Sequence, residues 1–158
     1  MSERTRLNDL KDILELLYEK LGDFEKELII NSSKPANFEL KQRIKREIIP
    51  DIRKYETEYW EISPLEAIII SDEEAETQLV QVEEAVASIE QIPSSNYPSE
   101  LISLLQEIRN KLDENNTASA KLKVVIPLIP AIASYELEME TEGLMYSAWE
   151  KIKGVVRG

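Results

Sequence analysis

A run of regularly spaced apolar residues in the first thirty positions constrains the fold most. From Leu7 onward these residues recur alternately every three and four positions over three heptads, at Leu7, Leu10, Leu14, Leu17, Leu21, Phe24 and Leu28. This spacing places all of them on one face of an α-helix and is typical of helices that pack as coiled coils. Ile13, Leu16 and Ile30 widen the apolar face beyond a two-helix seam. We therefore expect the helix to contact more than one neighbour, and the chain to self-associate as a dimer.

A second helix of similar length should follow this first one. The segment SSKPAN after Asn31 contains serine, proline and asparagine, which favour turns, and Asn37 has the character of a helix N-cap. Apolar residues then recur every three or four positions at Ile48, Ile52, Tyr55, Tyr59 and Ile62. Two long helices with a short link predict an antiparallel, coiled-coil-like hairpin over residues 1–62. Pro50 predicts a kink or a fresh helix start within the second helix.

Residues 63–158 are predicted to form a second part of the chain. Ser63 and Ser71 each precede a glutamate by three positions, the spacing of a capping box that begins a helix. Two further apolar seams follow, over residues 75–89 and 101–112, and each ends in a segment rich in turn-forming residues. These seams predict a second, shorter helical hairpin.

After Lys121 the pattern of the sequence changes. Leu122, Val124 and Ile126 alternate with other residues, and Tyr135, Leu137 and Met139 alternate with glutamates. Because a period of two is typical of strands, this segment predicts a small β-hairpin with Pro127 and Pro130 at its turn or irregular edge. An amphipathic helix that contains Trp149, capped by Thr141, is expected to follow. The predicted fold class is therefore mainly α with one small β element.

Composition bears on the classes of function that can be expected. The 158 residues include neither cysteine nor histidine, and the net charge is −12, of which residues 63–120 carry −10. The first fact removes thiolate nucleophiles, imidazole bases and common zinc ligand sets, and the second disfavours nucleic acid as a partner. Glutamates are numerous but fall on the solvent side of the predicted elements. We expect no enzymatic activity, no metal or cofactor, and a cytoplasmic location, because the N-terminus has no apolar signal segment.

Two groups of residues are candidates for interaction. Tyr55, Tyr59 and Trp60 cluster on the second helix, and Trp60 lies off the seam, so it could be an exposed protein-binding anchor. The uncharged stretch VVIPLIPAIA at 124–133 has three interpretations: folded core, an edge that docks a protein, or a hairpin that enters a membrane. The corresponding candidates are Val124, Ile126, Leu128 and Ile129, together with Trp149 on the last helix.

Two parts of the chain resemble known modules. LYEKLGDFEKELI, FELKQRIK and YETEYW resemble the effector-associated or adaptor-type helical hairpins of cyanobacterial signalling and defence proteins, which contain NACHT or other STAND-type switches, TIR domains or caspase-like domains. AKLKVVIPLIPAIASYELEMETEGLMYSAWEKIKG is similar to a module found in the same kinds of protein. The resemblance implies a regulatory or adaptor protein without a switch or effector domain of its own, and it transfers no catalytic residue. Pro50 departs from the hairpin pattern.

Two functions remain open at this point. The first is a non-enzymatic adaptor in signalling or antiviral defence, which recruits a protein partner through the apolar face of its first helix and its aromatic cluster. The second is a membrane-acting effector that inserts the 124–133 hairpin after activation.

Overall fold

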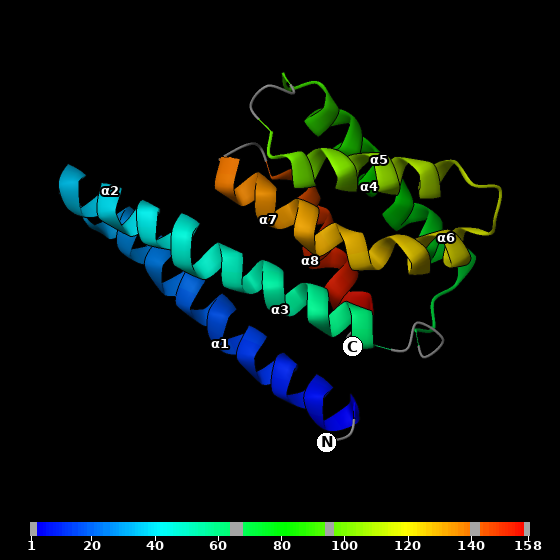
Figure 1. The fold of residues 1–158 in the computed structure, drawn as a ribbon, viewed down its shortest axis with the longest axis horizontal. Coiled ribbons are helices and arrows are strands. Elements are labelled where there is room, and N and C mark those ends of the chain that lie inside the picture. The colour runs from blue at the N-terminus through cyan, green and yellow to red at the C-terminus, as the bar shows by residue number, and fades with distance from the viewer. Residues whose placement is uncertain (1–2, 64–67, 94–96, 140–142, 157–158) are drawn as a thin grey trace. The chain divides into compact units, whose positions relative to one another are not determined.

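The computed structural model describes residues 3–63, 68–93, 97–139 and 143–156, and every regular element within these ranges is a helix (Figure 1). The prediction of a mainly α fold is confirmed. The chain forms two compact units, Met1–Ser63 and Pro64–Gly158.

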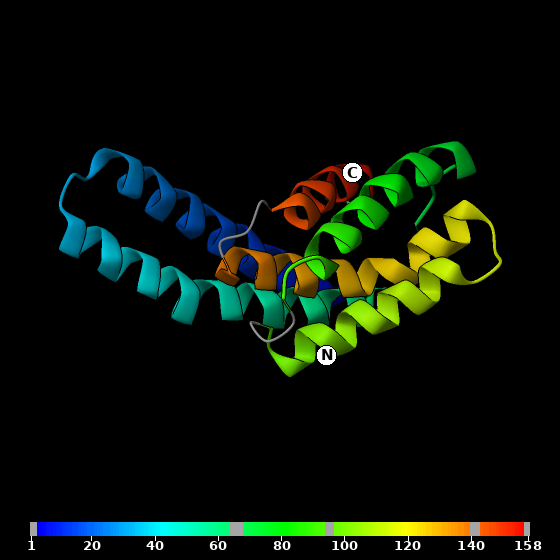
Figure 2. The ribbon, with the colours of Figure 1, turned by 90° about the horizontal axis from the view of Figure 1, so that it is seen from above.

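The first unit is a long antiparallel hairpin (Figures 1 and 2). Its outgoing arm is α1 (Glu3–Ile30), and its returning arm is a continuous helical run of α2 (Lys34–Arg43), η1 (Ile44–Ile48) and α3 (Ile49–Ile62). The arms pack mainly through α1 and α3. At the open end of the hairpin, the Arg6 guanidinium donates two hydrogen bonds to the Glu58 carboxylate, at 2.5 and 2.9 Å.

The turn between the arms differs from the expected one in its cap. The Ser33 hydroxyl accepts a hydrogen bond from the Ala36 amide, and Pro35 occupies one of the first two positions of α2. Serine and proline are favoured at these places, so the helix begins one turn before Asn37. The Asn37 side chain has another role, because its Nδ2 donates to the Asn31 carbonyl at 2.9 Å. It thereby ties the returning arm to the end of α1.

Pro50 is accommodated by a change of helix type. The residues before it form the π-helical turn η1, and the proline is in the first turn of α3. Proline has no amide hydrogen and crowds the carbonyl four residues earlier, so it is tolerated where a helix begins. A π-turn contains more residues than an α-helical turn, so the positions after it are rotated relative to a seam extrapolated with the α-helical period.

The second unit contains α4 (Asp72–Glu90), α5 (Ser99–Asp113), α6 (Ala118–Val125), η4 (Ile126–Leu128), α7 (Ile129–Met139) and α8 (Leu144–Val156). The long run from α6 to α7 contacts α4, α5 and α8, and α4 packs more extensively against α8 and α6 than against α5. Ser71 caps α4 as predicted, through a 3.1 Å bond from the Glu74 amide. The expected box at 63–66 extends into residues outside the described ranges, and the expected cap Thr141 lies outside them too.

The predicted β-hairpin is wrong, because residues 118–139 are helical. Burial follows a helical spacing at Leu122, Val125, Ile126 and Ile129, and every residue from Ile129 to Glu136 is buried, so α7 is enclosed on all its faces. Pro127 and Pro130 each fall within the first two positions of a new helical segment, where the missing amide hydrogen removes no helical bond. The alternation that predicted a strand covered only a few residues. Two of them, Leu122 and Ile126, are four positions apart and therefore also fit the helical spacing.

Candidate interaction surfaces

The apolar seam of α1 is used largely within the structure. Leu10, Leu14 and Leu21 are buried, whereas Leu7, Leu17, Phe24 and Leu28 are partly exposed. Phe24 also lies beneath the Arg43 guanidinium, whose central carbon is 5.0 Å from the ring centroid. Since α1 packs against α3, the seam serves mainly as the packing surface between the two arms of the hairpin. Its three buried leucines are not accessible to a partner.

The aromatic cluster does not present an exposed tryptophan. Trp60 is only 3% exposed, and its ring meets that of Tyr59 edge to face, with centroids 4.9 Å apart. Tyr55 and Tyr59 are partly exposed. The expectation that Trp60 is an accessible anchor is therefore not met.

The candidate edge at 124–133 is mostly interior. Ile126, Ile129 and Trp149 are buried and Leu128 is partly exposed, so only Val124 is exposed among these candidates. The helical run Ala118–Met139 is long and apolar enough by length and composition to cross a bilayer, yet 56% of its most apolar window is buried. The core helix of a water-soluble protein meets the same criterion. The packing of this segment matches the interpretation as folded core.

Three of the four large apolar side chains that are exposed among the described residues of the first unit flank the turn at the hairpin tip, where sequence reasoning placed no site. Ile29 and Ile30 end α1 and are 84% and 83% exposed, and Phe38 on α2 is 66% exposed. In the sequence, Ile30 precedes Asn31 and Phe38 follows Asn37. These two asparagines are joined by the hydrogen bond across the turn. We call these three residues the tip patch. The signal in the sequence was that Ile29 and Ile30 lie at the end of the seam, next to a turn.

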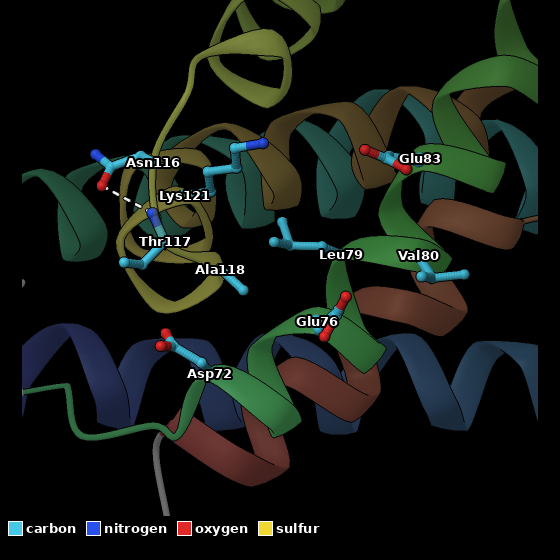
Figure 3. A pocket seen from close by; sticks show the side chains of 9 residues that line it. All are labelled: Asp72, Glu76, Leu79, Val80, Glu83, Asn116, Thr117, Ala118 and Lys121. Carbon is cyan, nitrogen blue, oxygen red and sulfur yellow. Dashed lines mark hydrogen bonds between the residues drawn. The ribbon is translucent and has the colours of Figure 1, made fainter.

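A second candidate is a groove between α4 and the start of α6, with a volume of about 440 Å³ (Figure 3). Its lining combines three carboxylates and one lysine with polar and apolar side chains, and consists of Asp72, Glu76, Leu79, Val80, Glu83, Asn116, Thr117, Ala118 and Lys121. Val80 is 49% exposed. The Asp72 carboxylate accepts a 3.0 Å hydrogen bond from the Ser119 amide. Hydrogen bonds from the Ser119 side chain and amide lower the pKa of Asp72 below its usual value, because they favour the charged carboxylate.

One carboxylate is buried inside the second unit. Glu136 on α7 is 3% exposed, and its Oε1 accepts a 2.8 Å hydrogen bond from the Tyr146 amide in the first turn of α8. Burial raises the pKa of Glu136, and hydrogen bonds from the Met145 and Tyr146 amides partly oppose this rise. Gly143, just before α8, has a φ of +72°, which glycine adopts without strain. Glu136 thus does the capping that a local side chain does at other helices.

No arrangement typical of a metal site occurs among the described residues, where no three acidic side chains come together to form one. The chain matches no protein-family model, and no curated protein or solved structure shows significant similarity to it. The resemblance to adaptor modules therefore stays a prediction.

Proposed function

We propose that this protein is a non-enzymatic adaptor that recruits a protein partner through the tip patch of its first unit. The observation that carries the proposal is the exposure of Ile29, Ile30 and Phe38 at one end of the helical hairpin. Single exposed apolar residues are common on protein surfaces, but several large ones gathered together are typical of interaction sites. The resemblance to adaptor modules of signalling and defence proteins supports the same class of function.

The geometry of the tip favours protein binding. Asn31 and Asn37 fix the turn through the Nδ2 to carbonyl hydrogen bond, and a second bond of 3.0 Å joins the Ser33 amide to the Asn31 side chain. A patch held by such bonds loses little conformational entropy when it binds, so more of its apolar burial contributes to affinity. Exposed aromatic residues are enriched at the centres of protein interfaces, and Phe38 is such a residue.

Photo-crosslinking in cells that naturally contain the protein tests this proposal. A benzoylphenylalanine replacing Phe38 should yield discrete crosslinked products on irradiation. The same probe replacing Leu16, which is equally exposed at 66% but lies in the middle of α1, is the matched control. Products from position 38 that are absent from position 16 support the tip patch. Identical products from both positions, or none from position 38, would refute it.

The membrane-acting alternative is favoured by one observation, the length and apolar character of the helix Ala118–Met139. As a β-hairpin this element is excluded, so insertion would require a whole helix to leave its packing in the second unit. Flotation with anionic vesicles separates the two functions. Flotation accompanied by a blue shift of Trp149 emission, in a Trp60→Phe background, would favour the membrane; protein left unbound would favour the adaptor.

A further inference from the structure

Two exposed helical stripes on this chain are complementary in charge and spacing. On α2, Lys34, Phe38 and Lys41 follow one another at steps of four and three residues, and all three are exposed. These steps place them on one face of the helix, within two turns. The stripe therefore presents a large aromatic ring between two cations.

The second stripe lies on α4, on the wall of the acidic groove. Glu76, Val80 and Glu83 also follow steps of four and three residues, and all three are exposed. All three line the groove, and in Figure 3 the Val80 side chain points away from α6, opposite to that of Leu79. This stripe presents an apolar residue between two anions. Helix α4 attracts cationic side chains, because it carries seven acidic residues and no basic one.

We propose that the α2 stripe of one copy of this chain docks on the α4 stripe of a second copy. The helices lie parallel, with Lys34 opposite Glu76 and Lys41 opposite Glu83. Phe38 then packs on Val80, at the edge of the groove. This inference rests on the proposed function, since it names a partner for the tip patch.

The parallel direction follows from the order of the steps. With both helices running the same way, steps of four and three on α2 meet steps of four and three on α4, so all three pairs align. With one helix reversed, a step of four meets a step of three, and one pair is displaced by about 1.5 Å along the axis and about 100° around it. In this register a lysine faces a glutamate on each side of the contact between Phe38 and Val80. A shift of either helix along its axis would separate these opposite charges, so the register is favoured.

The contact is small, so we expect it to be weak. A few residues on each side bury less surface area than a stable protein interface does. We therefore expect a weak complex, with a dissociation constant of roughly 10⁻⁵ to 10⁻³ M. The two stripes are different surfaces on different units, so each copy has one of each to offer. Such a contact can be made head to tail along a series of copies.

Charge-exchange variants test the proposal by sedimentation velocity over a range of protein concentrations. The variants Lys34→Glu/Lys41→Glu and Glu76→Lys/Glu83→Lys each lose one stripe and should stay monomeric where the native chain associates. Mixed together, they retain one native stripe each and should form a 1:1 complex. Each replacement changes the charge by two, so the variants carry −16 and −8; both remain negative, and non-specific attraction does not explain their association.

A chain that carries all four exchanges has both stripes reversed and should associate again. Lys11→Glu/Lys26→Glu and Glu73→Lys/Glu84→Lys make the same charge changes at other exposed positions and should leave association intact. A native chain that is monomeric at all concentrations, or a mixture that forms no complex, would overturn the inference. Crosslinking to other proteins from position 38 would still stand in that case, so failure of the self-docking is distinguishable from failure of the adaptor function.

Discussion

Replacing Glu136 by glutamine and by leucine separates the two effects that this buried carboxylate has on the second unit. Its hydrogen bond from the Tyr146 amide stabilises the start of α8, whereas burial of its charge opposes folding. Glutamine keeps an oxygen that can accept the bond and removes the charge. Leucine removes the acceptor of the partly buried Tyr146 amide, and the loss of such a bond costs up to about 1–3 kcal/mol.

The pH dependence gives the prediction its sign. The pKa of Glu136 in the folded state is raised above its unfolded value of 4.5, mainly by burial. Folding therefore favours the protonated carboxyl, so this contribution to stability is fully present below the unfolded pKa and is lost as the pH rises through the folded one. Each tenfold difference between the two protonation constants corresponds to about 1.4 kcal/mol. The glutamine variant should thus gain stability relative to the native chain as the pH rises from 4 to 8.

Thermal unfolding followed by Trp149 fluorescence measures these differences. Trp149 is buried on α8, and a Trp60→Phe background makes it the only tryptophan. For a unit of this size, 1 kcal/mol changes the melting temperature by about 4–8 °C. At pH 7 the glutamine variant should melt at or above the temperature of the native unit, and the leucine variant below it. Equal losses in both variants, or the same pH dependence in the native and glutamine chains, would refute the reasoning.

Three further predictions concern local contacts. Asp72→Asn should lower the melting temperature at neutral pH, and this difference should shrink as the pH falls below 3.8 and through the folded pKa of Asp72, which hydrogen bonds from Ser119 depress; a difference that does not shrink on acidification would contradict this. Leu14→Ala should destabilise the first unit by about 2–5 kcal/mol in chemical unfolding, whereas Leu16→Ala, at an exposed position, should change stability by less than about 0.5 kcal/mol. Asn37→Ala should cost about 1 kcal/mol and speed amide hydrogen exchange at the tip, and unchanged exchange there would argue against the fixed turn.

The first hairpin could be predicted because its signal is long. Seven apolar residues at helical spacing over three heptads leave no alternative to a helix, and the turn at 31–33 follows from serine and proline. The segment 122–139 was misassigned because β-branched residues, two prolines and a short alternation favour a strand locally. Helical burial is periodic only from Leu122 to Ile129, and α7 after it is buried on every face, so its sequence has no amphipathic pattern that would indicate a helix.

The remaining features depend on contacts between distant positions. Glu136 caps a helix that begins eight residues later, and no local motif indicates this. Trp60 was placed off the seam because the apolar residues after Ile52 recur at steps of three and four, whereas burial continues in steps of four through Ile52, Glu56 and Trp60. The tip patch could not be predicted without the position of the turn. Phe38 lies at the same end of the hairpin as Ile29 and Ile30 only because the chain reverses at residues 31–33.

Methyl resonances of isoleucine test the central claim, that the hairpin tip is where this protein binds its partner. In a chain labelled at isoleucine methyl groups, Ile29 and Ile30 report on the tip, and the buried Ile126 and Ile132 are internal references. On addition of unlabelled lysate from cells that naturally contain the protein, we predict chemical-shift changes at Ile29 and Ile30 that are much larger than those at the references, and their loss in a Phe38→Glu variant. Shifts at the tip no larger than those of the references would contradict the account.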